Sequence, residues 1–183
     1  PQAAQIARRE QEKEMKNTKI KKILVPVDFT AASDNAIAAA ASLAVLMKSD
    51  IYLVHVFESS NYSYSVFAKT EALLPSFVEI KKSIGAKMED LKEHMIKKYN
   101  LKCSVVVLSG HIHSEIYKFS TKKKVDLIVM GTHGVSGYKE FFIGSNAQRL
   151  VTVSDIPVLT IKKKKKNTSF KNILIPIDNS VHS

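Results

Sequence analysis

The sequence predicts an α/β fold: a five-stranded, mainly parallel sheet with helices on both faces. Short β-branched runs at 21–27, 50–57, 103–108, 125–130 and 156–161 alternate with longer stretches of helical periodicity. Strands that alternate with helices are joined by right-handed crossovers into parallel sheets. The chain has 183 residues, 45% of them hydrophobic, which is enough to build the core of one domain.

Helical signals fill each interval between these strands. "DFTAAS" (28–33) offers Thr30 or Ser33 as the N-cap of an alanine-rich helix that runs to about Met47. Residues 58–70 show no clean period and are expected to form a loop. The next two helices follow from apolar residues recurring every three or four positions, and the last helix is expected from about Ser145 to Val153. The recurring residues are Phe77, Ile80, Ile84, Met88, Leu91 and Met95 in one helix, and Ile112, Ile116 and Phe119 in a shorter one.

The formal net charge of +11 does not indicate a nucleic-acid-binding protein. Nearly half of it is one lysine run, 162–166, and three more charges are the run 122–124. Short lysine blocks are usually solvated linkers or helix ends, and aromatic residues do not interleave with them as stacking platforms for single strands require. We expect binding neither to nucleic acid nor to an anionic membrane.

The single cysteine and the N-terminal composition indicate a cytoplasmic protein. Cys103 cannot form an internal disulfide and lies in an alternating stretch, so we expect a small core residue in a reducing compartment. Residues 1–19 are polar and charged without the apolar segment of a secretory signal, and "AIAAAASLAVLM" is too short to span a bilayer.

The end of the sequence repeats its beginning. "KNILIPIDNSVHS" (171–183) matches "KKILVPVDFTAAS" (21–33) at an offset of 150 residues. We therefore expect a charged N-terminal extension (1–19), one domain (20–161), a lysine-rich linker (162–170) and the first strand of a second repeat (171–183). The chain would then be the first half of a tandem protein.

A glycine-dense stretch follows the fourth predicted strand. "GTHGVSGYKEFFIGSN" (131–146) holds four of the six glycines, with Gly131, Gly134 and Gly144 separated by two and nine residues. Glycine allows the backbone to approach a ligand closely, and the N-terminus of a helix attracts anions. This pattern is neither a Walker loop nor the dinucleotide motif, and it predicts a phosphate cradle. If the first and fourth strands are neighbours, "PVDFT" meets this loop at the same edge of the sheet.

These residues resemble a universal stress protein. The resemblance rests on "ILVPVDFTAAS", "DLIVMGTHG" and "GSNAQRLVTVSDIPVLTI", and residues 131–145 satisfy the pattern G-x2-G-x9-G-(S/T) of the nucleotide-binding members. It covers about residues 20–161. It implies a Rossmann-like fold of the adenine nucleotide alpha-hydrolase-like type, a dimer formed through the last strand or a pseudo-dimer with the second repeat, and binding of ATP or another adenine nucleotide.

The resemblance also assigns roles to individual residues. Asp28 would lie near ribose or near a magnesium ion bound to the phosphates, and Val56 would pack on adenine. Asn146 departs from the small apolar residue common in the family, and either a phosphate hydrogen bond or helix capping would explain it. The implied nucleotide-binding residues are Pro26, Val27, Asp28, Val56, Gly110, Met130, Gly131, His133, Gly134, Gly144, Ser145 and Asn146.

No catalytic residue stands out. A hydrolase needs a positioned base or nucleophile, yet the sequence shows no Ser-His-Asp order and no nucleophile elbow. The first hypothesis is therefore a stress-response module that binds an adenine nucleotide, with at most slow ATP turnover. Two alternatives are an ATP-hydrolysing or adenylating enzyme of related fold and an interaction domain without a ligand. "DFTAAS" stands where the enzymes carry a Ser-Gly-Gly phosphate loop, and the complete glycine pattern disfavours the third hypothesis.

Overall fold

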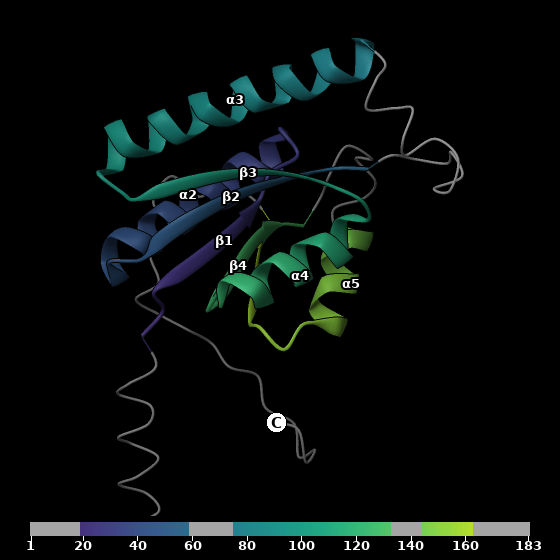
Figure 1. Cartoon of the computed structure of the whole chain (residues 1–183). Coiled ribbons are helices and arrows are strands. Elements are labelled where there is room, and N and C mark those ends of the chain that lie inside the picture. Colours follow the sequence, from purple (N-terminus) through teal and green to yellow (C-terminus); the bar gives the residue numbers. More distant parts are fainter. Residues whose placement is uncertain (1–18, 59–74, 133–143, 163–183) are drawn as a thin grey trace, which may run out of the picture.

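The computed structural model describes residues 19–58, 75–132 and 144–162 (Figure 1). In chain order the elements are β1 Lys22–Pro26, α2 Ala31–Met47, β2 Asp50–Phe57, α3 Pro75–Tyr99, β3 Cys103–Ser109, α4 Ile112–Lys123, β4 Leu127–Gly131, α5 Ser145–Val153 and β5 Val158–Ile161. The predicted alternation of strands and helices is confirmed. Nearly all of the expected loop at 58–70 and of the N-terminal extension at 1–19, and the whole repeat at 171–183, lie outside the described residues and stay predictions.

The five strands form one parallel sheet in the order β3-β2-β1-β4-β5. The chain builds outward from β1 to β3, then crosses to β4 on the other side of β1. The order therefore reverses between β1 and β4, where Ile23 pairs with Leu127 and Leu24 with Ile128. Open sheets bind ligands at such a reversal, beyond the carboxyl ends of the strands.

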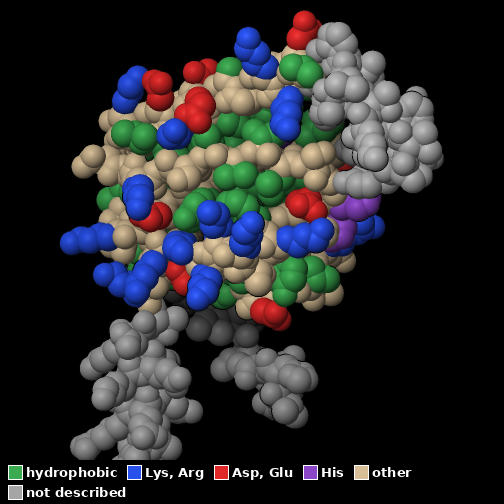
Figure 2. Space-filling model, in the orientation of Figure 1, with side chains coloured by type: hydrophobic (Ala, Val, Ile, Leu, Met, Phe, Trp, Pro, Cys, Tyr) green, Lys and Arg blue, Asp and Glu red, His purple; other side chains and the backbone are tan. Residues whose placement is uncertain are grey.

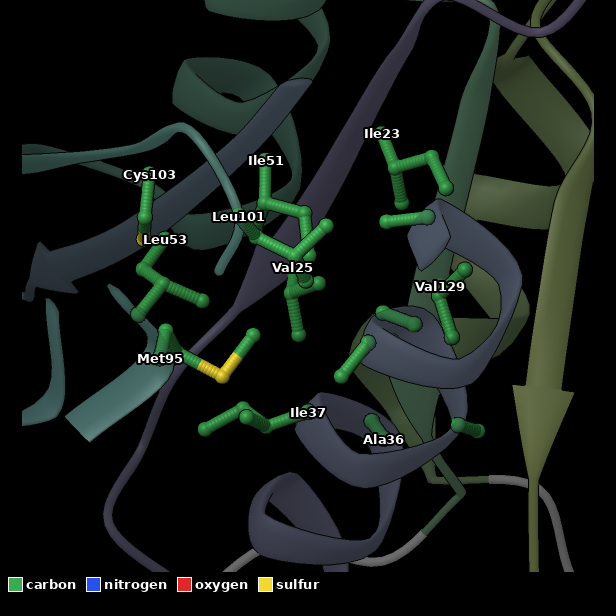
Figure 3. Close-up of a cluster of buried hydrophobic side chains, with 14 of the residues drawn as sticks. Ile23, Val25, Ala36, Ile37, Ile51, Leu53, Met95, Leu101, Cys103 and Val129 are labelled. Carbon is green, nitrogen blue, oxygen red and sulfur yellow. The ribbon is translucent and has the colours of Figure 1, made fainter. Parts of the chain in front are cut away.

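Two apolar layers cover the sheet. One contains α2 and α3 with strand residues such as Ile23, Val25 and Leu53, and Figure 3 shows these side chains converging with Met95 and Ile37. The other contains α4 and α5 with the alternate strand residues. This alternation follows from the pleat, since successive side chains of a strand point to opposite faces. Strands buried on both faces explain the nearly continuous apolar runs of the sequence.

The helix ends agree with their sequence signals. Thr30 is the N-cap of α2, because its side chain accepts a hydrogen bond from the amide of Ser33; Ser33 itself lies inside the helix. Lys48 and Lys124 close α2 and α4 in the left-handed conformation. Cys103 is buried, as expected, and burial raises the pKa of its thiol to about 11.

The lysine block 122–124 lies at the C-terminal end of α4, exposed to solvent. Cations there complement the negative end of the helix dipole. Figure 2 shows basic side chains interspersed with acidic ones across this face of the molecule. The residues at the other end of α4 border the reversal point of the sheet, so this block is remote from it. Within the described residues, no helix is both long and apolar enough to cross a bilayer.

Candidate functional site

A cavity of about 390 Å³ opens at the carboxyl ends of β1 and β4. Its volume falls in the range of about 300–1,000 Å³ that is typical of small-molecule sites. Nine of the residues predicted from the sequence line it: Pro26, Val27, Asp28, Val56, Met130, Gly131, Gly144, Ser145 and Asn146. The segment after β1 and the glycine-dense stretch after β4, which the sequence analysis placed at one edge of the sheet, therefore both contribute residues to one cavity.

Three of the predicted residues are not among those that line the described cavity. Gly110 directly follows β3 and has a φ of 140°, which favours glycine. Its amide donates to the carbonyl of Phe57, and it is not among the residues that line the cavity. His133 and Gly134 lie outside the described residues. Their assignment to the phosphates stays a prediction.

One wall of the cavity is apolar. Val56 and Met130 come from strand ends, and Ile112 and Ile116 come from the first turns of α4. Ile116 is fully buried, and Val56 and Met130 are nearly so. An apolar surface of this kind suits a planar aromatic group, because such a group gains most of its binding energy from contact area.

Asp28 is held in a tight turn at the mouth of the cavity. Its Oδ1 accepts the amide of Thr30 at 3.0 Å and the hydroxyl of Thr30 at 2.6 Å. The same hydroxyl accepts the amide of Ser33 at 3.4 Å, which caps α2. One carboxylate oxygen is thus committed to the turn. Asp28 is exposed, and within the described part of the chain only Oδ1 accepts a hydrogen bond, so the second oxygen can meet a ligand or a cation.

The opposite wall is the N-terminus of α5. Gly144 is the N-cap, so Asn146, the second residue of the helix, does not occupy the cap position. Ser145 and Asn146 occupy the first turn and line the cavity. The first amides of a helix have no partner within the helix and carry a partial positive charge. This wall can therefore hold an anion without a lysine or arginine, and neither type lines the described cavity.

The two described glycines of the motif, Gly131 and Gly144, differ in whether the structure requires glycine at their positions. Gly144 has φ −56° and ψ 148°, which any residue can adopt, so its conformation does not require glycine. Gly131 lies against α2: a β-carbon there would be 2.8 Å from the backbone and side chain of Ala32. Gly131 is needed for packing, independently of any ligand.

Sequence reasoning missed several polar residues of the cavity. Ser33, considered only as a cap, is 3% exposed and its hydroxyl donates to the carbonyl of Thr30. Thr132 is 6% exposed and directly follows Gly131, a position from which it could have been inferred. His55 is half-buried and borders the cavity, and its Nδ1 lies 2.7 Å from the carbonyl oxygen of Val27. Nothing in the sequence indicates that last contact.

Curated relatives are similar over most of the chain. Universal stress protein MJ0531 of Methanocaldococcus jannaschii is 32% identical over 146 residues, covering 80% of this chain and 84% of the relative. Universal stress protein MJ0577 of the same organism is 30% identical over 155 residues, covering 79% of this chain and 96% of the relative.

Solved structures share the fold. A structure of MJ0577 superposes with a TM-score of 0.63 at 26% identity, covering 81% of this chain and 99% of that chain. A universal stress protein in complex with cAMP has a TM-score of 0.58 at 15% identity, covering 79% of this chain and 98% of that one. A universal stress protein from Archaeoglobus fulgidus in complex with dAMP has a TM-score of 0.53 at 20% identity, covering 79% of this chain and 99% of that chain. The model of the universal stress protein family matches residues 19–162, and the chain therefore belongs to the universal stress protein family.

Proposed function

We propose that this protein binds an adenine nucleotide in the cavity between β1 and β4, as a regulatory module of the stress response. The observation that carries the proposal is that an apolar wall and the N-terminus of α5 line the same cavity. These are the two surfaces that a nucleotide needs, one for its base and one for its phosphates. Two structural neighbours were solved with the adenine nucleotides cAMP and dAMP, which supports the same ligand class here.

In the proposed complex the base packs on Val56 and Met130, and the phosphates extend toward Ser145 and Asn146. Asp28 lies at the strand end beside the ribose. A carboxylate close to phosphates repels them unless a cation lies between, and Mg²⁺ is commonly held by one or two carboxylates together with substrate phosphates. We therefore include ATP with magnesium in the proposal, with Asp28 as the protein's ligand to the ion.

Dimerisation belongs to the proposal as well. β5 lies at one edge of the described sheet, and its four residues are each only partly buried. An edge strand presents unpaired backbone groups to a partner. A second copy, or the second repeat expected from residues 171–183, would cover this edge.

Calorimetric titration with ATP, AMP, cyclic AMP and GTP, each with and without magnesium, tests the proposal. We expect saturable binding of adenine nucleotides, weaker binding of GTP, and tighter binding of ATP when magnesium is present. Phosphate release measured on the same samples distinguishes a binding module from a slow ATPase. A folded chain that binds none of these at millimolar concentration would favour the interaction-domain alternative.

A further inference from the structure

His55, Phe29 and Lys87 form a cluster next to Asp28, and His55 also borders the cavity. Strand residues alternate, so His55 shares the α2 and α3 face with Ile51 and Leu53, while Val54 and Val56 face the other layer. The Nδ1 of His55 lies 2.7 Å from the carbonyl oxygen of Val27. A carbonyl only accepts, so the imidazole donates this hydrogen bond in either charge state. The bond fixes the residue directly before Asp28.

The residue directly after Asp28 is fixed too. Phe29 has a φ of 61°, a left-handed conformation that is unfavourable for a side chain of this size. The other positive-φ residues apart from glycine in the described chain are Lys48, Asn100 and Lys124, each of which follows a helix end, where this conformation is common. Phe29 instead precedes a helix at the cavity mouth. Unfavourable conformations of this kind persist where the surroundings enforce them, and they cluster at functional sites.

Two side chains contact the ring of Phe29. Its ring lies against the ring of His55, with centroids 5.0 Å apart, and the Nζ of Lys87 from α3 lies 5.6 Å from its centroid. A cation at this distance from the face of an aromatic ring is attracted to the ring. The cluster therefore connects β2, the turn after β1 and α3.

We propose that His55, Phe29 and Lys87 are positioning residues that hold the Asp28 carboxylate in its ligand-binding orientation. The inference rests on the proposed nucleotide site. Val27 and Phe29 are anchored on either side of Asp28, and Thr30 occupies its Oδ1. The second carboxylate oxygen remains available to the ligand, and the cluster sets the direction in which this oxygen points.

A double-mutant cycle separates positioning from general stability, with affinity for magnesium-ATP measured by calorimetry and folding by thermal unfolding. His55→Leu removes the donor and is expected to weaken binding three- to tenfold, the equivalent of one hydrogen bond. His55→Asn is expected to restore most of the affinity, because its amide can donate to Val27 from a similar place. In an Asp28→Asn background, His55→Leu is expected to weaken binding much less, since both changes disable the same group.

Lys87→Met tests the third member of the cluster. We expect about a twofold loss of affinity from the lost cation–aromatic contact. Lys82→Met, another exposed lysine of α3, is the matched control and should bind as wild type.

The outcomes separate this inference from the function on which it rests. If the folded wild-type chain binds no nucleotide, both fall. If the wild type binds and His55→Leu binds equally well, or its effect adds fully to that of Asp28→Asn, the positioning role alone is wrong. Failure of His55→Asn to recover affinity while its melting temperature matches wild type would also overturn it.

Discussion

Gly131 and Ala32 are in backbone contact: a β-carbon on Gly131 would lie 2.8 Å from the carbonyl carbon and oxygen of Ala32. The end of β4 therefore packs directly against the first turn of α2, beside the turn that holds Asp28. This contact fixes the distance between the two sides of the proposed nucleotide site. It also explains a motif glycine by packing, independently of phosphate binding.

Gly131→Ala is accordingly expected to destabilise the fold. Separations under 3.0 Å force backbone to move, and overpacking of this kind costs about 1–3 kcal/mol in the free energy of unfolding. Urea unfolding measures it. Gly85→Ala is the matched control, because no atom lies within 4 Å of its β-carbon and Gly85 lies inside α3, where alanine stabilises by about 0.5–1 kcal/mol. Equal stability of Gly131→Ala and wild type would contradict the packing account.

Asn146→Asp is expected to weaken phosphate binding without weakening the fold. A negative charge in the first turn of α5 stabilises the helix by about 0.3–1 kcal/mol, yet it repels a bound phosphate. AMP affinity should fall severalfold while adenosine affinity is unchanged. Gln148→Glu introduces the same charge two residues further along the helix, at an exposed position outside the cavity lining, and should leave AMP affinity near that of wild type. Equal losses in the two variants would argue against a phosphate at Asn146.

Thr30→Val is expected to reduce both stability and affinity. It removes the cap of α2, which costs about 1 kcal/mol, and the hydroxyl that fixes Asp28. Thr30→Ser keeps the hydroxyl and should retain most of both properties. Thermal unfolding and nucleotide titration of the pair check this. Loss of stability with unchanged affinity would show that Asp28 does not need the turn.

Stability should fall between about pH 9 and pH 11 because of Cys103. Burial raises the pKa of its thiol from 9.0 to about 11. The unfolded chain ionises this thiol first, so the folded state loses stability as pH rises through this window and keeps it below. Cys103→Ala lacks the effect, and lysine titration is common to both proteins. The difference in free energy of unfolding between them should therefore narrow across the window, and a constant difference would contradict the shift.

Helical periodicity and β-branched runs predicted the helices and strands well, because each pattern reflects which faces of the element are buried. The period of Met88 and Met95 in α3 and the β-branched run of β2 reflect burial on one face and on both faces of their elements. Boundaries were less certain where caps are ambiguous. β4 begins at Leu127 rather than at Val125, because the amide of Val125 is used to close α4 through the carbonyl of Ser120.

The site was predictable only where sequence position and chemistry coincide. Asp28 lies just after β1, and Gly144 and Ser145 begin α5. The topology of the sheet alone therefore brings these residues together. The contacts of His55 with Val27 and Phe29 depend on the twist and register of β1 and β2, which no local pattern contains. The same holds for the approach of Ala32 to Gly131, which gives this glycine a packing role that the sequence pattern does not reveal.

The most direct test of the central claim is nuclear magnetic resonance of the isotope-labelled chain titrated with magnesium-ATP. If the nucleotide occupies the cavity between β1 and β4, the amide signals that shift should belong to Asp28, Val56, Ser145 and their neighbours, while those at the start of the strands, such as Lys22 and Asp50, stay in place. Saturable shifts confined to the amino ends of the strands, or none with a folded chain at millimolar ATP, would contradict the account.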